Sequence, residues 1–324
     1  MTIQQAKERI DYLDIAKAIG ITLVVLRHCS ISIGVFAMFH MPLFFIISGM
    51  FFREGNGFVK MVKNKLNKLL IPWGFFYLLG CLFFYVVAVV KSELKENYFG
   101  FIDVFVHRAT FNYPIWYLLC LFWVFILYFV ICKISTLHIR TIVVIALSLC
   151  GYLLGKFHFF IPCYVDIALT SLFFFHIGYT LRTRTEIFST DKKRIKVDAL
   201  MVLVLGLITF LGYYCFNPKI QLATNLINPL CFVFSTTGAL ALIIVSKFAK
   251  PWQWLTYIGK NSIIILCWHN FFQRISEYAF NQLDINATCK WGGVFICTMC
   301  LSIIMIPISL RIIPWFVGKT NIIK

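Results

Sequence analysis

Residues 115–132, IWYLLCLFWVFILYFVIC, carry no charged side chain and contain neither Gly nor Pro. At a rise of 1.5 Å per residue, a helix of this length is about 27 Å long, close to the thickness of the hydrocarbon layer of a bilayer. A strand of a membrane barrel would instead alternate in polarity over about ten residues. The stretch therefore predicts a helix that crosses a membrane.

Similar apolar stretches recur along the chain, in which 60% of the 324 residues are hydrophobic and 13% are charged. A soluble domain cannot bury that much apolar surface. We therefore expect an all-α fold, a polytopic membrane helix bundle of about ten helices. Residues 1–324 are expected to form one integral-membrane domain, with no soluble domain and no cleaved signal peptide. The expected spans are 13–33, 35–52, 70–90, 115–132, 141–156, 163–181, 197–216, 224–246, 255–273 and 291–313.

Positive charge is concentrated in short loops between the apolar stretches, notably in residues 53–68 and 182–196. Because Lys and Arg accumulate in cytoplasmic loops, these clusters predict that both termini face the cytoplasm. Membrane orientation thus explains the formal net charge of +17, and we expect no nucleic acid as a partner. The 12 Cys lie mostly within apolar stretches, which favours packed thiols over a disulfide framework.

The first expected span holds four ionisable residues, which are costly in hydrocarbon and therefore candidates for function. They are Asp14, Lys17, Arg27 and His28. Eleven residues at 100° each bring His28 back to the face of Lys17, about 16 Å further along the helix. Asp14 lies one turn from Lys17 and is placed to pair with it. The alternative is that Asp14 and Lys17 snorkel at the interface and that His28 is a structural histidine.

Two further histidines, His40 and His269, reach a depth similar to that of His28 if the predicted topology holds. The three side chains would then share one layer of the bundle, although each one alone is equally well explained as a structural histidine. Asp166 and His176 lie about 80° away from a common helical face. We therefore expect these two residues to contact different neighbours and to be structural.

Aromatic residues stand at several expected span ends, where such residues commonly anchor a helix at the membrane surface. They are Trp116, Tyr117, Trp252, Trp254 and Trp291. The sequence shows no metal-ligand cluster, nucleophile elbow, Walker loop or dinucleotide fingerprint in a usable context. Any chemistry is thus expected from buried histidines and basic groups, without a metal.

Four segments resemble motifs of the integral-membrane acyltransferase-3 family. The first, YLDIAKAIG at 12–20 with the following Arg27 and His28, is similar to the family's pattern of a basic residue and a histidine separated by ten residues. The second, third and fourth segments are HMPLFFIISG at 40–49, KNKLNKLLIP at 63–72, and IGKNS at 258–262 leading to His269. The third segment carries Lys where the family more often has Arg, and the fourth is similar to the branch that acetylates sugars.

The resemblance implies a membrane O-acyltransferase of the bacterial inner membrane. Such enzymes typically transfer an acetyl or similar short acyl group from cytoplasmic acyl-CoA to a hydroxyl of a cell-surface glycan or its lipid-linked precursor. Acetyl-CoA, a glycan acceptor and membrane lipids are therefore the expected partners. Direct transfer and transfer through a covalent intermediate both remain open. A transporter of an acyl donor or a small polar solute is the alternative, since buried charges also line transport pathways.

Roles for individual residues follow from the resemblance and from their expected depth. His28 is the candidate general base, assisted by Arg27 and His40. The candidates for binding the phosphates of CoA are Lys17, Lys65, Lys68 and Lys260. The candidates for other contacts to the substrate are Asp14, Ser48, Trp116 and His269.

Overall fold

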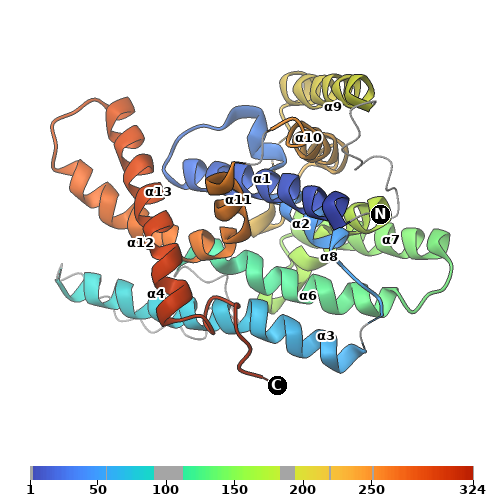
Figure 1. Cartoon of the computed structure of the whole chain (residues 1–324), viewed down its shortest axis with the longest axis horizontal. Coiled ribbons are helices and arrows are strands. Elements are labelled where there is room, and N and C mark those ends of the chain that lie inside the picture. Colours follow the sequence, from blue (N-terminus) through green and yellow to red (C-terminus); the bar gives the residue numbers. More distant parts are fainter. Residues whose placement is uncertain are drawn as a thin grey trace.

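A computed structural model of the chain describes residues 3–55, 57–90, 112–182, 194–218, 220–249 and 252–323. Figure 1 shows that the described residues form helices packed against one another, with almost no strand. Much of the expected loop at 91–114 and of the basic loop at 182–196 lies outside the described residues.

The described elements are named here in chain order. The α-helices are α1 (Ile3–His28), α2 (His40–Met50), α3 (Phe58–Lys65), α4 (Ile71–Val90), α6 (Trp116–Ile131), α7 (Leu137–Lys156), α8 (Val165–Leu181), α9 (Ile195–Phe216), α10 (Cys231–Val245), α11 (Gln253–Lys260), α12 (Ser262–Asn281) and α13 (Ala287–Ile312). The 3₁₀ turns are η1 (Gly34–Met38), η3 (Tyr113–Ile115), η4 (Pro162–Tyr164) and η6 (Leu222–Thr224), and η2 (Leu66–Leu70) is a π-helical turn. Strands β1 (Ile220–Gln221) and β2 (Leu226–Ile227) pair antiparallel.

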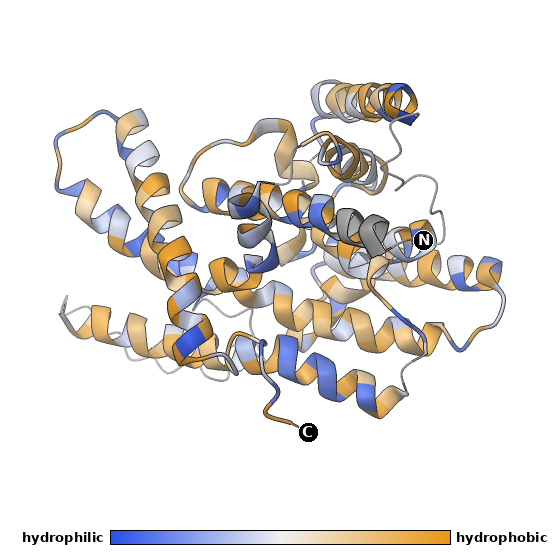
Figure 2. Ribbon diagram, in the orientation of Figure 1, coloured by the Kyte–Doolittle hydropathy of each residue, from blue (hydrophilic) through white to orange (hydrophobic). Residues whose placement is uncertain are grey.

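Six of the described helical segments are long and apolar enough to cross a membrane. Helices α2 and α10 are also apolar but shorter. Hydrophobic residues predominate along most helices, whereas hydrophilic residues gather on α3 and in connections (Figure 2). The predicted polytopic all-α bundle is confirmed. The six segments are Phe58–Val89, Tyr113–Ile131, Leu137–Lys156, Pro162–Leu181, Ile195–Phe216 and Ala287–Ile312.

The expected span at 35–52 is wrong in its extent. Residues Gly34–Met38 form the 3₁₀ turn η1, and α2 covers only His40–Met50, an α-helix about 16 Å long. Phe39 separates the two elements with φ −120° and ψ −5°. Pro42 lies in the first turn of α2, where a missing N–H costs no helical hydrogen bond.

Two other expected spans also differ from the observed helices. The span at 255–273 is divided into α11 and α12 at Asn261, whose Nδ2 donates to the Tyr257 carbonyl at 2.9 Å. This side chain satisfies a backbone acceptor at the end of α11, as Asn commonly does at helix ends. The span at 224–246 begins later, at Cys231, because strands β1 and β2 precede it.

Glycines permit close helix crossings at the centre of the bundle. A Cβ atom on Gly178 of α8 would lie 1.8 Å from the Ile46 carbonyl oxygen of α2. In the same crossing, a Cβ atom on Gly49 of α2 would lie 2.0 Å from the Phe175 carbonyl oxygen of α8. Small residues allow helix backbones to approach in this way inside membranes. Gly49 of the second motif therefore fixes α2 against α8.

Helix α9 lies at the edge of the bundle beside α10 (Figure 1). Its outward side chains are large and apolar, including Leu200, Leu203 and Phe210, as expected for a surface that contacts lipid. The charge near its start is neutralised, because the buried Asp198 carboxylate pairs with Lys247 at the end of α10.

Candidate active site

The first half of α1 carries a cluster of paired charges. Lys17 Nζ lies 2.5 Å from Asp14 Oδ1. Lys260 Nζ of α11 lies 3.9 Å from Asp14 Oδ2 and 3.6 Å from Asp11 Oδ1. Helix α11 comes this close because a Cβ atom on Gly259 would lie 1.8 Å from the Asp14 carbonyl oxygen. The predicted pairing of Asp14 with Lys17 is confirmed, and the first and fourth motifs meet here.

The segment after α13 completes this charged region. Lys319 Nζ donates to the Lys260 carbonyl oxygen at 3.2 Å. Asn67 Oδ1 accepts hydrogen bonds from the backbone amides of Ile322 and Ile323, at 2.7 and 2.9 Å. Asn67 Nδ2 donates in turn to the Ile323 carbonyl at 2.9 Å. The third motif therefore fixes residues 319–323 over the lysines of the first and fourth motifs.

The pKa of Lys319 reflects the charged groups that surround its ammonium group. Loss of hydration lowers the pKa of its ammonium group, Lys17 lowers that pKa further, Asp14 raises it, and Lys68 lowers it. With Lys260, four lysines thus lie near one another. Such an excess of positive charge suits a polyanionic ligand.

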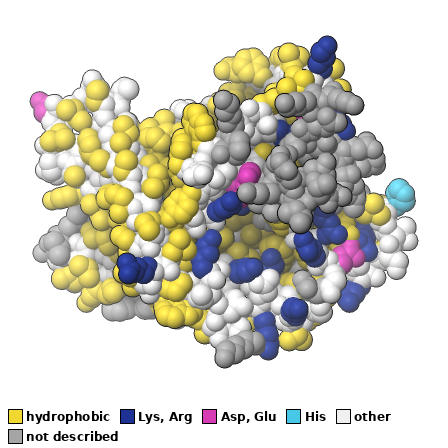
Figure 3. Space-filling view, viewed as in Figure 1, with side chains coloured by type: hydrophobic (Ala, Val, Ile, Leu, Met, Phe, Trp, Pro, Cys, Tyr) yellow, Lys and Arg dark blue, Asp and Glu magenta, His cyan; other side chains and the backbone are white. Residues whose placement is uncertain are grey.

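A narrow cavity of about 150 Å³, here called the lysine pocket, begins at Lys17 and Lys260 and follows α1. Its polar lining includes Ser48 and Tyr117, whose hydroxyl oxygens lie 3.4 Å apart. In Figure 3 a hollow with a hydrophobic floor lies near the middle of the molecule, and Lys and Arg side chains surround it. The apolar wall of the lysine pocket comprises Ile21, Val24, Met41, Phe44, Ile47, Leu121, Ile263 and Leu266.

Two histidines meet beyond the far end of the lysine pocket. Val24 of α1 and Leu266 of α12 line that end, and His28 and His269 follow about one helical turn later on the same two helices. The two imidazole centroids lie 5.1 Å apart. His40, at the start of α2, is an electrostatic neighbour of His28. The structure therefore brings the three predicted histidines together.

Backbone carbonyls fix the protonation of two of these rings. His269 Nδ1 lies 3.0 Å from the Ile265 carbonyl, and His40 Nδ1 lies 3.0 Å from the Ala37 carbonyl. Because a carbonyl only accepts, each Nδ1 carries a proton, and Nε2 keeps its lone pair when the ring is neutral. His269 is fully buried, and no described group hydrogen-bonds its Nε2. Among the described residues, the site thus holds one buried imidazole nitrogen, His269 Nε2, without a hydrogen-bond partner.

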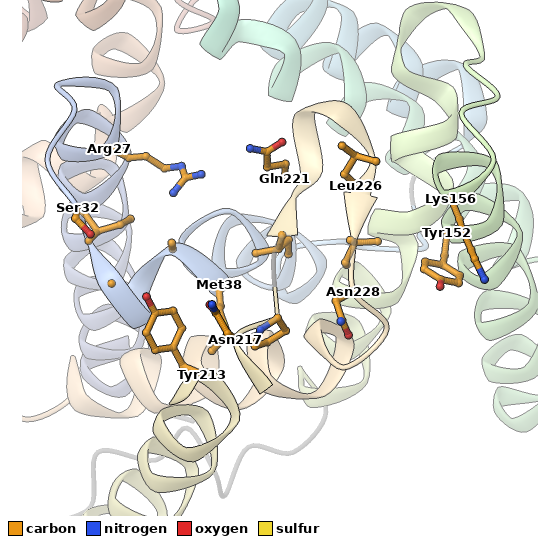
Figure 4. Close-up of a pocket in the computed structure, with 16 residues that line it drawn as sticks. Arg27, Ser32, Met38, Tyr152, Lys156, Tyr213, Asn217, Gln221, Leu226 and Asn228 are labelled. Carbon is orange, nitrogen blue, oxygen red and sulfur yellow. The ribbon is translucent and has the colours of Figure 1, made fainter. Parts of the chain in front are cut away.

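A second cavity, of about 990 Å³, lies at the other end of α1. We call it the hairpin pocket, because β1 and β2 form part of its wall. Arg27, the neighbour of His28 in sequence, extends into it, and Gln221 of β1 reaches in from the hairpin (Figure 4). The histidine pair therefore lies between the two pockets. Other polar residues that line the hairpin pocket are Ser32, Tyr152, Lys156, Tyr213, Asn217 and Asn228.

A family model described as an acyltransferase domain (Acyl_transf_3) matches residues 10–306, which include α1 from residue 10 onward and all three histidines. The chain belongs to the acyltransferase-3 family. Searches of curated proteins and of solved structures found no match. The family predicted from the four motifs is confirmed, and the chain is a multi-pass membrane acyltransferase. This result supports the enzyme over the transporter alternative.

Four other residues that were predicted for the site of this acyltransferase lie in surroundings that differ from one residue to the next. Ser48 lines the lysine pocket. Lys65 Nζ lies 3.3 Å from the centre of the Phe125 ring, and Lys68 is exposed. Trp116 is buried. Lys65, Lys68 and Trp116 line neither of the two pockets.

The prediction that aromatic residues anchor the helix ends of this acyltransferase at the membrane surface is only partly correct. Trp252 and Trp254 are exposed, as expected for residues at a membrane surface. For Trp116 and Tyr117 the expectation is wrong, because both are buried inside the bundle. Tyr117 packs edge-on against Phe45 of α2, with ring centroids 5.1 Å apart. The two aromatics at the start of α6 therefore belong to the protein interior.

Asp166 and His176 have separate neighbours, as predicted. Asp166 Oδ2 accepts a hydrogen bond from Asn225 Nδ2 at 3.2 Å. His176 Nδ1 lies 2.7 Å from the Tyr128 hydroxyl, and its Nε2 lies 3.0 Å from the Thr141 hydroxyl. The contacts of His176 thus join α8 to α6 and α7, whereas Asp166 joins α8 to the turn between β1 and β2.

Sequence reasoning missed several residues that build the site. Asn67 lies within the third motif but was overlooked between two lysines. Lys319 follows the last apolar stretch, and nothing in the sequence links it to Lys260. Gln221 and the β-hairpin lie inside a stretch that reads as the approach to a spanning helix. Only the polar composition of residues 217–228 signalled that these residues differ from a span.

Proposed function

We propose that the protein is an O-acetyltransferase that takes an acetyl group from cytoplasmic acetyl-CoA and transfers it to a hydroxyl of a cell-surface glycan or its lipid-linked precursor. The lysine pocket binds the donor, and the hairpin pocket binds the acceptor. The bacterial inner membrane is the proposed location, with both termini and the lysine pocket on the cytoplasmic side.

One observation carries this proposal: the order of groups along α1. Lys17 stands at the lysine pocket, Val24 at its far end, His28 just beyond, and Arg27 in the hairpin pocket. An acyl transfer across a membrane needs a donor site, a base and an acceptor site in this order. The separation of Lys17 and His28, about 16 Å along a helix, is roughly the reach of a phosphopantetheine arm.

The lysine pocket suits the donor by charge and by shape. Lys17 and Lys260 in the pocket, together with the neighbouring Lys68 and Lys319, supply ammonium groups for the phosphates of CoA. Asp14 neutralises part of this charge and holds Lys17 and Lys260 in place, so we assign it a positioning role. The apolar wall accepts the pantetheine arm and excludes water from the thioester.

The chemistry uses the imidazole nitrogens between the pockets. His28 takes the proton of the acceptor hydroxyl while the hydroxyl oxygen attacks the thioester carbonyl. The carbon–sulfur bond then breaks, CoA leaves as the thiolate, and the proton held by His28 passes to that sulfur. Arg27 lies where it stabilises negative charge on the carbonyl oxygen during the attack. His269, with its proton fixed on Nδ1, accepts a hydrogen bond from His28 or from the acceptor.

The proposal is tested with purified protein in lipid nanodiscs, radiolabelled acetyl-CoA and a surface-glycan fraction. Release of CoA and label in the glycan are both measured. His28→Ala is expected to lower kcat by about 10²- to 10⁴-fold, the usual contribution of general base catalysis. Lys17→Ala is expected to raise the KM for acetyl-CoA with little change in kcat.

Matched controls are available in the chain. His138 and Lys133 are exposed and line neither pocket, so His138→Ala and Lys133→Ala should behave like the wild type. Unchanged transfer by His28→Ala would show that the base is wrongly assigned. If folded wild-type protein neither binds acetyl-CoA nor releases CoA from it, the proposed function is wrong.

A further inference from the structure

The hairpin pocket has the lining of a carbohydrate site with an added positive charge. Its polar groups include the amides of Asn217, Gln221 and Asn228, and the ring of Tyr213 forms part of the wall. Amides and aromatic rings in a concave surface fix the orientation of a polar ligand. Lys156, at the end of α7, is a cation in the same wall.

Lys156 is not neutralised by a described carboxylate. It is exposed, and no described acidic residue pairs with it. None of the residues that line the pocket is Asp or Glu. Asp166 lies behind the wall: it is fully buried, and its Oδ2 accepts a hydrogen bond from Asn225. Within the part of the chain that the structure describes, the cavity therefore presents positive charge and its lining holds no carboxylate.

Arg27 and Lys156 occupy opposite sides of the hairpin pocket, with the β-hairpin between them (Figure 4). Arg27 lies beside His28, where the acceptor hydroxyl must react under the proposed mechanism. Lys156 is remote from the reacting atoms. Its ammonium group therefore has no evident part in the acetyl transfer itself, and its position suits a second part of an extended ligand.

We propose that the acceptor glycan is anionic and that Lys156 binds an acidic group located at least one sugar unit away from the hydroxyl that is acetylated. This inference rests on the proposed function and adds the charge class of the substrate. The acidic group is a carboxylate of the glycan or a phosphate of its lipid carrier, because both offer oxygens to a lysine ammonium group. Selection arises since a neutral glycan leaves Lys156 without a partner.

The experiment measures binding and transfer separately, with the full chain in nanodiscs. The probes are chitotetraose, which is neutral, a hyaluronan tetrasaccharide, which carries uronate carboxylates, and a short-chain polyprenyl phosphate. Equilibrium binding of each probe is compared in wild type, Lys156→Gln and Lys156→Glu. Lys290→Gln is the matched control, because Lys290 is a half-buried lysine near a helix end that lines neither pocket.

We expect one of the anionic probes to bind more tightly than chitotetraose. Lys156→Gln should weaken that binding about threefold to fivefold, as for a partly solvated ion pair, and Lys156→Glu should weaken it further. Added salt should reduce the preference. Preference for the tetrasaccharide identifies a glycan carboxylate, and preference for the polyprenyl phosphate identifies the lipid carrier.

The inference is overturned if neither anionic probe binds more tightly than chitotetraose, or if Lys156→Gln and Lys290→Gln bind every probe alike. Acetyl transfer is scored in the same samples. Anion binding that depends on Lys156, without CoA release or transfer to any acceptor, would support the inference on ligand charge and contradict the proposed function. Transfer that is equally fast to neutral and anionic glycans would support the proposed function and contradict the inference on ligand charge.

Discussion

The imidazole rings of His28 and His269 lie 5.1 Å apart, although one residue belongs to the first helix and the other to α12 near the end of the chain. His269 is fully buried with its Nδ1 proton fixed by a backbone carbonyl, whereas His28 is only half-buried. Under the proposed function, His28 is therefore the ring that contacts the substrate, and His269 is the ring that positions His28.

The first prediction concerns this pair. His269→Gln should lower kcat about 10²-fold, because it removes the imidazole that orients His28 or shares its proton. The double variant His28→Ala/His269→Gln should be no slower than His28→Ala alone, since residues that act as a unit are not additive. Transfer rates of the four forms measure this coupling. Independent, multiplicative losses would show that the two rings do not act together.

The second prediction concerns Gly259. In Gly259→Ala the new methyl group meets the Asp14 carbonyl oxygen, so α11 must move away from α1. We expect a loss of ~1–3 kcal/mol in stability, as for overpacked sites, together with a higher KM for acetyl-CoA because Lys260 moves with α11. Thermal unfolding and donor kinetics measure both effects. Gly206→Ala, where a Cβ atom meets nothing within 4 Å, is the control.

The third prediction concerns the clamp between Asn67 and residues 322–323. Asn67→Ala removes three hydrogen bonds to the backbone of residues 322–323 and one to the Lys63 carbonyl, each worth about 1 kcal/mol. We expect the KM for acetyl-CoA to rise about fivefold because Lys319 is no longer held over the pocket. Lys319→Ala should raise the KM similarly, and the double variant should add little. Fully additive effects would mean that Asn67 acts independently of Lys319.

The fourth prediction concerns pH. The pKa of Lys319 is lowered by lost hydration and by Lys17, with an opposing effect of Asp14 and a further lowering by Lys68. An ammonium group binds phosphate only below its pKa, so its contribution should disappear as pH rises, at a lower pH than for an ordinary lysine. Profiles of kcat/KM for acetyl-CoA report the free enzyme. Lys319→Arg should extend activity to higher pH, and identical profiles would exclude this role.

Sequence reasoning gave the all-α class and the main features of the site. The stripe from Lys17 to His28 follows from helical periodicity alone, and the structure places a pocket at each end of it. A common layer for His28, His40 and His269 is what their predicted depth indicates. Depth gives no lateral position, however, so only the structure shows that α1 and α12 bring two of the rings within 5.1 Å.

The features that sequence reasoning missed are either local breaks within apolar stretches or contacts between distant segments. The break at Asn261 and the short helix α2 lie inside apolar stretches, where hydropathy reports burial and not helix continuity. The β-hairpin is set by local turns that an apolar window averages away. The contact between Asn67 and residues 322–323 joins two polar segments whose pairing has no local signal.

The contact between Asn67 and residues 322–323 also affects the order in which the protein assembles during synthesis. Asn67 enters the membrane region early during synthesis, whereas its partners Ile322 and Ile323 emerge from the ribosome late. Nascent chains therefore acquire most of their helices before Lys319 can bind the Lys260 carbonyl. Under the proposed function, chains that stall or are cleaved before this segment should insert as helical bundles yet bind the acyl donor poorly.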